Sequence, residues 1–465
     1  MVAIYRAGGK QPAKKSSPVV EMDVERWDLE AHGVVHHQGK VGFVAGALPG
    51  ERVKVRIHDD RSRFFHAQLL KVLTPSSVRQ AAVCPAAGRC GGCQLHHVGA
   101  VAALQLKQDA LDQHLRHQLK LTELPWQAPL QADTLGYRRK ARLGVWFDKQ
   151  RKHFAIGFRG MQSNKIESIS ECQVLSPVIA PSISVLHQQL PRLKQGAAIT
   201  HVELLDANGQ AYVVVRHVKP LPASDIALLC AAWPEAFWFG ESAPDQIEAW
   251  QPNSPQPHYV LPDGQVVYFA LGDFIQVNQS VNQLMIQQAL AWLSLDKSKR
   301  VLDLYCGVGN FSLALAPHVA EVIGLEGVAA MVERANHNAA INASKTQSSI
   351  NAHFYHADLH QSWHEYHWYG VAKGTSTVAS HSKPVATGYD IVLLDPARAG
   401  AEAAIPQLVE LKPTQVLYVS CHPVTFARDA ALLLAGGYEI EKIGAMDMFP
   451  QTSHLEVMAL FRRKR

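Results

Sequence analysis

A cysteine and a glutamate near the C-terminus have the residue types and the surroundings of a nucleophile and its base. Cys421 stands in the motif YVSCHP, directly after an apolar strand predicted over residues 415–419, and Glu456 follows in HLEVMALF. A thiolate is a strong nucleophile, and a carboxylate can accept a proton during a reaction. The pair therefore predicts covalent catalysis at the carboxyl edge of an α/β sheet.

A second pair of polar residues is expected at the same edge. Asp395 and Arg398 stand in LLDPARAG, directly after another apolar strand. Ligands of open α/β sheets bind outside the carboxyl ends of the strands. The alternatives are structural, since Asp395 could cap a helix and Cys421 could be a small buried hydrophobe. Strand ends that bear Asp, Arg and Cys together favour a catalytic site.

A glycine-containing turn upstream predicts a nucleotide-like ligand. VLDLYCGVGNF places a strand, a turn with Gly307 and Gly309, and the start of a helix in succession, and Glu326 closes the next strand in GLEG. Glycines let the backbone approach a ligand closely, as in dehydrogenases. The full GxGxxG pattern of a dinucleotide site is missing. The combination resembles the S-adenosyl-L-methionine (SAM) site of class I methyltransferases, where a carboxylate like Glu326 accepts hydrogen bonds from ribose hydroxyls.

Four of the seven cysteines have the spacing of a metal site. Cys84, Cys90 and Cys93 lie in one short Gly-rich segment, and Cys172 follows alone in SECQVL. Four thiolates can hold either a tetrahedral zinc ion or an iron–sulfur cluster. Zinc ribbons use two CxxC knuckles, and only one is present. The spacing favours [4Fe–4S] and leaves zinc as the alternative.

The elements that must position these residues fall into four segments. Residues 1–17 are expected to be a flexible basic arm, and residues 18–74 a small β-barrel domain with alternating strands in VGFVAG and ERVKVRI. Residues 75–270 form a central α/β domain whose topology the pattern does not reveal, with a helix over 101–119. Residues 271–465 alternate strands with helices, which predicts a largely parallel, doubly wound sheet. The fold class is therefore α/β.

Composition and charge narrow the protein class. The chain has 465 residues, of which 47% are hydrophobic and 18% charged, as in globular proteins. No apolar run approaches the ~20 residues that span a bilayer, so we expect no contact with a membrane. The sequence shows no export signal, and its number of cysteines is odd, so we expect no disulfides and a cytoplasmic protein. Nine Lys or Arg face one acid between Arg138 and Lys165. Segregated positive charge predicts a polyanion partner, with residues 138–140 among the phosphate contacts. A merely solvated face is the alternative.

Taken together, the motifs resemble the family of RNA uracil-C5 methyltransferases. The likeness runs from about Pro18 to Arg463 and includes a TRAM-like, OB-like N-terminal domain, the cysteine quartet, FIQVN, VLDLYCGVGNF, GLEG, LLDPARAG, YVSCHP and HLE. It is greatest for the branch that carries both a TRAM domain and an iron–sulfur cluster and methylates a uracil of 23S rRNA. The resemblance implies a C-terminal class I, Rossmann-like methyltransferase domain and a monomeric enzyme whose target uracil is single-stranded or flipped.

The resemblance also implies a role for each matching residue. Cys421 would be the nucleophile and Glu456 the base, and Cys84, Cys90, Cys93 and Cys172 would hold the cluster in a structural or RNA-binding role. The cofactor and the target would be bound by Gln276, Tyr305, Asn310, Glu326, Asp358 and Asp395. Arg398 is expected to lower the thiol pKa or to stabilise an enolate oxygen.

Two departures from the family pattern and two alternative functions accompany this interpretation. His422 follows the cysteine where the family usually has Asn, and residues 363–388 resemble an insertion. The same chemistry on tRNA or on another rRNA uracil is the first alternative. A catalytically idle RNA-binding assembly factor that keeps the fold is the second.

Overall fold

The computed structural model describes residues 18–244, 246–346, 350–366, 368–369 and 388–464. The expected flexible arm and most of the expected insertion lie outside these residues. The chain divides into two compact units. The first comprises residues up to 81 together with 97–110, and the second comprises 82–96 together with 111–465.

The first unit is built on a six-stranded sheet with the strand order β1-β5-β6-β4-β3-β2. Its strands are β1 (Val19–Asp23), β2 (Arg26–Trp27), β3 (His32–His37), β4 (Lys40–Ala45), β5 (Arg52–Asp60) and β6 (Phe64–Thr74). In β5 the residues alternate between exposed and buried, with Val53 and Val55 in the core and Lys54 in solvent. Helix α1 (Ala100–Leu119) follows. The sequence predicted both this alternation and this helix.

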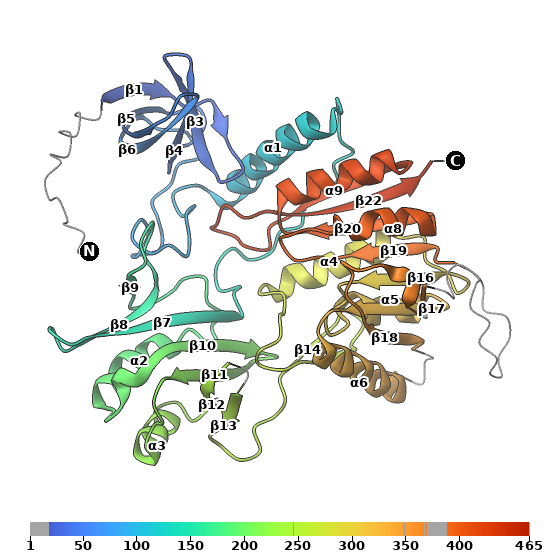
Figure 1. Cartoon of the computed structure of the whole chain (residues 1–465). Coiled ribbons are helices and arrows are strands. Elements are labelled where there is room, and N and C mark those ends of the chain that lie inside the picture. Colours follow the sequence, from blue (N-terminus) through green and yellow to red (C-terminus); the bar gives the residue numbers. More distant parts are fainter. Residues whose placement is uncertain (1–17, 245, 347–349, 367, 370–387, 465) are drawn as a thin grey trace, which may run out of the picture. The chain divides into compact units, whose positions relative to one another are not determined.

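The second unit contains a central sheet with the order β13-β12-β11-β10-β7-β8-β9. Its strands are β7 (Lys140–Asp148), β8 (His153–Arg159), β9 (Ile166–Ser168), β10 (Ile199–Ala207), β11 (Gln210–His217), β12 (Ala236–Ala243) and β13 (Gln246–Ala249). Helices α2 (Ser182–Gln189) and α3 (Ala223–Ala232) lie together on one side of it (Figure 1). A core that includes Leu143, Ile156 and Trp238 fills the space beneath these helices.

The C-terminal part of the same unit carries a second seven-stranded sheet, with the order β18-β17-β16-β19-β20-β22-β21. Its strands are β16 (Arg300–Leu304), β17 (Glu321–Glu326), β18 (Ala352–His356), β19 (Ile391–Leu394), β20 (Gln415–Ser420), β21 (Tyr438–Met446) and β22 (Glu456–Arg463). The five neighbouring strands β18, β17, β16, β19 and β20 pair parallel in that order. β22 pairs antiparallel with β20 on one side and with β21 on the other. The parallel, doubly wound prediction is confirmed, although β18 and β21 had not been predicted.

Helices connect these strands and bury them (Figure 1). They are α4 (Gln279–Trp292), α5 (Asn310–Leu315), α6 (Ala329–Thr346), α8 (Ala404–Leu411) and α9 (Pro423–Ala435), and a short hairpin of β14 (His258–Val260) and β15 (Val266–Tyr268) precedes α4. Strands β16, β19 and β20 are buried along their whole length, which is why they read as continuous apolar runs rather than alternating ones. None of the helices in the described residues is both long enough and apolar enough to cross a membrane.

Candidate active site

The two residues predicted to perform the chemistry lie on neighbouring strands at the carboxyl edge of the C-terminal sheet. β20 and β22 pair antiparallel, with Val419 opposite Met458 and Ser420 opposite Val457. The ladder ends there, Cys421 directly follows Ser420 and Glu456 directly precedes Val457, and the charge of Glu456 acts on the Cys421 thiol. Because opposed residues on antiparallel strands have Cβ atoms about 5 Å apart, the end of this ladder brings thiol and carboxyl to the same place at the sheet edge.

Glu456 is a buried acid without a compensating partner. Its exposed fraction is 4%, and its Oε2 accepts no hydrogen bond from any described residue. Burial, and next the negative charge of Asp395, raise the pKa of Glu456 from 4.5 to about 8. Burial likewise raises the pKa of Asp395 to about 7. A carboxyl group with a pKa near the working pH has the property required of a general base.

The surroundings of the Cys421 thiol disfavour its ionised form. Burial raises its pKa from 9.0 to about 11, and the charges of Glu456 and Asp395 add to this effect. Arg398 acts in the opposite direction, as expected from the sequence, but its influence is smaller. Activation of the thiol therefore requires that bound ligands change the charge or the solvation around it.

His422 begins the next helix instead of entering the site. It is the N-cap residue of α9, its Nδ1 accepts a hydrogen bond of 3.4 Å from the backbone N–H of Thr425, and Pro423 occupies the first helical turn. Asn is among the best N-cap residues because its side chain accepts the same bond. The substitution of His for the usual Asn thus preserves a cap, which in turn fixes where the strand before Cys421 ends.

The predicted cofactor loop lies at the same edge of the sheet. Tyr305 follows β16 with a left-handed φ of 64°, and its buried hydroxyl has no partner among the described residues. Gly309, with φ 98°, precedes α5. The Glu326 carboxylate accepts hydrogen bonds of 3.0 Å from the backbone N–H groups of Gly307 and Val328. A strained residue with an unsatisfied hydroxyl beside a glycine turn is typical of a ligand-binding loop.

The remaining cofactor-pocket candidates are Asp358, Asn310 and Gln276. Asp358 is exposed beyond the end of β18, and its negative charge contributes to the raised pKa of Tyr305. Asn310 exchanges two hydrogen bonds with Asn282, at 3.0 and 3.1 Å. Gln276 is 8% exposed.

Arg139 joins the segments that carry Gln276 and Asn310. Its Nε donates to the Gln276 carbonyl at 2.7 Å, and its guanidinium lies 4.8 Å above the Tyr259 ring. Tyr259 in turn donates its hydroxyl to Asn310 Oδ1 at 3.0 Å. Because Arg139 is only 4% exposed, its assignment as a phosphate contact was wrong. Lys140 also faces inward, toward the carbonyls of Leu271 and Asp273.

Nothing in the sequence indicates this inward role of Arg139, since its neighbours are basic as well. Asp303, a buried acid of β16, was also missed. Its Oδ2 accepts a hydrogen bond of 2.5 Å from the Ser312 hydroxyl, and burial raises its pKa to about 7. The position of Asp303 inside the buried apolar run of β16 could have indicated that its side chain points inward.

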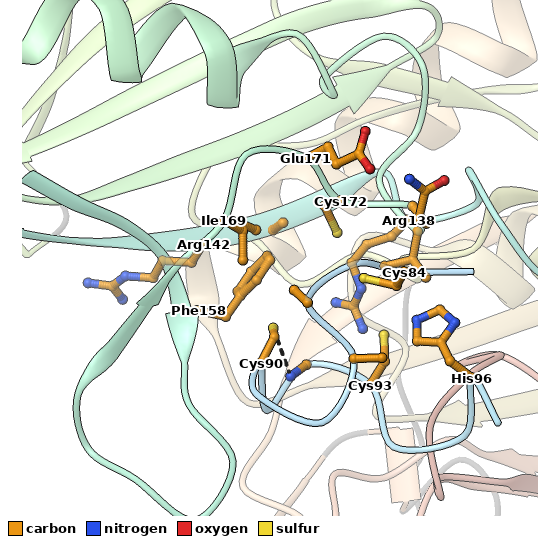
Figure 2. A pocket seen from close by; sticks show the side chains of 16 residues that line it. Cys84, Cys90, Cys93, His96, Arg138, Arg142, Phe158, Ile169, Glu171 and Cys172 are labelled. Atoms are coloured by element: carbon orange, nitrogen blue, oxygen red, sulfur yellow. Dashed lines mark hydrogen bonds between the residues drawn. The ribbon is translucent and has the colours of Figure 1, made fainter. Parts of the chain in front are cut away.

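The four cysteines of the predicted quartet line one cavity, and all four are free. Figure 2 shows their sulfur atoms pointing into this space, with the guanidinium of Arg138 beside them. The cavity measures about 280 Å³, and the pKa of Cys93 is raised to about 12 by burial first and then by its neighbours Cys172 and Cys90. Among the described residues, no three His, Cys, Asp or Glu side chains are arranged to hold a single metal ion. The iron–sulfur cluster stays a prediction.

The cysteine loop also contacts the segment that leads to Glu456. The backbone N–H groups of Gln94 and Leu95 donate to the Gln451 carbonyl at 2.9 and 3.0 Å. The Tyr137 hydroxyl donates to the carbonyl of Pro450 at 2.9 Å. The loop that bears three of the cysteines therefore supports the backbone a few residues before the predicted base.

Comparison with protein families gives two matches along this chain. The family model described as tRNA (Uracil-5-)-methyltransferase matches residues 259–464, and that of the TRAM domain matches residues 18–70.

Curated relatives match the whole chain. A protein of Pseudoalteromonas translucida named 23S rRNA (uracil(1939)-C(5))-methyltransferase RlmD is 40% identical over 467 residues, which cover 100% of both chains. An Aeromonas salmonicida protein with the same name is 41% identical and covers 97% of this chain and 99% of its own.

A solved structure shares the fold. It is the Pyrococcus abyssi tRNA (uracil-54, C5)-methyltransferase in complex with S-adenosyl-L-homocysteine, with a TM-score of 0.69 and 22% identity. The match covers 95% of this chain and 100% of that one.

Proposed function

This chain belongs to the family of RNA uracil-C5 methyltransferases, and on that premise we propose that it methylates C5 of one uracil in 23S rRNA with SAM as the methyl donor. The relatives that match it from end to end carry that activity in their names. The observation that carries the proposal is the pairing of β20 with β22, which ends beside Cys421 and Glu456 at the ligand-binding edge of a methyltransferase sheet.

The reaction needs a nucleophile because C5 of uracil does not attack a methyl group at a useful rate. Addition of the Cys421 thiolate to C6 forms an S–C6 bond and moves the electron pair of the C5–C6 double bond into an enolate. C5 then becomes nucleophilic, so one difficult step is divided into two easier ones. SAM, when bound, supplies an electrophilic methyl group and a positive sulfonium charge.

Glu456 completes the cycle by removing a proton. After methylation C5 carries both a hydrogen and the methyl group, and the Glu456 carboxylate takes that hydrogen as a proton. The C5–C6 double bond re-forms as the S–C6 bond breaks and Cys421 leaves. The net change is the replacement of one C5 hydrogen by a methyl group with release of one proton. The pKa of about 8 supports Glu456 in this role.

The unliganded site offers suitable groups for both substrates. We assign Tyr305, Glu326, Asn310 and Asp358 to the SAM side. Gln276 and Asp395 are assigned to the region where SAM and the uracil meet. The buried Tyr305 hydroxyl and Glu456 Oε2 both lack partners among the described residues, which fits a site completed by a ligand. Reaching C6 requires an unstacked base, so the target is a single-stranded or flipped uracil.

The cysteine cavity is proposed to hold a [4Fe–4S] cluster. Four free thiols around about 280 Å³ suit a cluster, because a single zinc ion needs four ligands about 2.3 Å from one point. When bound, such a cluster would link the loop of Cys84, Cys90 and Cys93 to Cys172. Contacts of that loop with Gln451, a few residues before Glu456, support a structural role for the cluster.

The enzyme is proposed to be a monomer. Ribosomal RNA is its proposed partner through the TRAM domain and the central domain. We place the activity in the cytoplasm, where bacterial ribosomal RNA is made and assembled.

The experiment that tests this function is methyl transfer from labelled SAM to a 23S rRNA fragment, followed by nuclease digestion and mass spectrometry. We expect 5-methyluridine at one position and a loss of at least about 1,000-fold in Cys421→Ser. Cys230→Ser, which changes a cysteine of α3 outside the site, should keep full activity. Methylation of tRNA alone would replace the rRNA assignment. SAM binding without transfer to any RNA would support the idle assembly factor instead.

A further inference from the structure

A large aromatic side chain of the central sheet lies exposed to solvent. Trp146 is 65% exposed, although an indole ring gains much by burial. Its neighbours in β7, Val145 and Phe147, point to the opposite face and pack into or against the core beneath α2 and α3. Phe147 also contacts Phe154 of β8, with ring centroids 4.7 Å apart. The strand therefore presents the Trp146 ring to solvent.

Two arginines lie on the same sheet face as this ring. Alternate residues of β7 share a face, so Arg142 and Trp146 point the same way. In β8, Gly157 pairs with Gly144 of β7, which puts Arg159, two residues further, on this face as well. We call Trp146, Arg142 and Arg159 the Trp146 platform. Gly144 and Gly157 lie between its members and contribute no side chains, and the Ile166 side chain of β9 covers Gly144.

The positive charge of the platform is not neutralised within the protein. Arg142 and Arg159 are exposed, and neither forms an ion pair or a side-chain hydrogen bond with another residue that the structure describes. Glu203 lies opposite Arg142 in the sheet, but its carboxylate is 3.1 Å from Lys140 Nζ. The adjoining hairpin, residues 149–153, adds two lysines, an arginine and a histidine. A planar ring among unpaired cations complements a nucleobase and its phosphates.

We propose that the Trp146 platform binds one unpaired nucleotide of the RNA substrate, outside the catalytic site, by stacking its base on Trp146 while Arg142 and Arg159 contact the flanking phosphates. The proposal rests on the proposed function, since it assumes an RNA substrate. Aromatic rings stack on any base, and guanidinium groups contact phosphates without reading sequence. Bases in a duplex are already stacked, so the platform selects single-stranded RNA.

The platform acts on binding rather than on the chemical step. Trp146 and Arg142 lie on β7, whereas Cys421 and Glu456 lie at the edge of the other sheet. Loss of stacking should therefore raise KM for RNA and leave kcat unchanged. Because Trp146 is largely exposed, its replacement opens no cavity in the core.

The test measures binding of a fluorescein-labelled 12-nucleotide oligouridylate to the full-length protein by anisotropy, at several salt concentrations. We expect Trp146→Ala to weaken binding about 10-fold, with an unchanged salt slope, because stacking is not ionic. Trp146→Phe should recover most of the affinity. Arg142→Gln and Arg159→Gln should each lower the salt slope by about one.

A matched control and a second readout separate this inference from the proposed function. Tyr355→Ala removes another exposed aromatic residue, at the end of β18, and should bind RNA as the unchanged protein does. Methyl transfer to the 23S rRNA fragment by the unchanged protein tests the proposed function by itself. If that transfer occurs and Trp146→Ala leaves both KM and oligouridylate affinity unchanged, the platform is refuted. The platform would also be refuted if Trp146→Ala weakened the binding of a 12-base-pair RNA duplex as much as that of the oligouridylate.

Discussion

Glu456→Gln should stabilise the protein in a pH-dependent way. Glu456 is 4% exposed, and its Oε2 accepts no hydrogen bond from the described residues, so the folded state accepts its negative charge poorly. Its pKa rises from 4.5 to about 8 on folding. An acid whose pKa is raised on folding costs no stability below its unfolded pKa. Stability is then lost as the pH rises from about 4.5 to about 8.

The magnitude follows from the two pKa values. Each pH unit between them is worth about 1.36 kcal/mol of unfolding free energy. The unchanged protein should therefore lose about 3 kcal/mol at pH 7 and about 5 kcal/mol above pH 8, relative to an uncharged side chain. Glutamine cannot ionise, so the variant avoids this loss while keeping the shape of the side chain.

The assay is urea unfolding of both proteins between pH 4.5 and 9. The unfolding free energy of Glu456→Gln should exceed that of the unchanged protein increasingly with pH and match it near pH 4.5. Glu441→Gln is the control, because Glu441 of the adjacent strand is partly exposed and paired with Arg462 at 2.7 Å. A gain for Glu456→Gln that is the same at every pH, or absent throughout, would refute the electrostatic reasoning.

Three further predictions concern the surrounding residues. Arg139→Met should reduce kcat at least 10-fold and weaken SAM binding measured by calorimetry, because the Gln276 carbonyl loses its hydrogen-bond donor. Unchanged kcat and SAM affinity would contradict a role of Arg139 in positioning Gln276. Cys172→Ser should abolish the visible absorbance of anaerobically purified protein and lower its melting temperature, whereas unchanged absorbance would exclude that ligand. Arg398→Gln should shift the alkylation of Cys421 by iodoacetamide to higher pH, since Arg398 lowers the thiol pKa, and an unchanged profile would contradict this role.

The sequence predicted those parts of the site that depend on order along the chain. Three apolar runs, which end at or just before Glu326, Asp395 and Cys421, were identified as parallel strands. Strands covered on both faces have continuous apolar sequences instead of an alternation of polar and apolar residues. The topology of such sheets then brings their carboxyl ends to one edge. The pairing of Glu456 with Cys421 depends in addition on the register between β20 and β22, which the pattern does not encode.

Other parts could not be predicted, because they depend on packing between segments far apart in the sequence. Arg138, Arg139 and Lys140 are three consecutive basic residues that the sequence does not distinguish. Only Arg139 is buried, and it packs against Tyr259. β21 was missed because polar residues such as Glu441 interrupt its apolar pattern, although its pairing with β22 completes the sheet.

The most direct test of the central claim uses a 23S rRNA fragment that carries 5-fluorouridine at the target position. Fluorine at C5 cannot leave as a proton, so elimination stalls after methylation and the enzyme stays attached to the RNA. With SAM present, we expect a covalent protein–RNA adduct that resists denaturation. The RNA in this adduct should be attached to the peptide that contains Cys421. Cys421→Ala should form none. An adduct that persists in Cys421→Ala, or methylation of normal RNA without any adduct on the fluorinated RNA, would contradict covalent catalysis by Cys421.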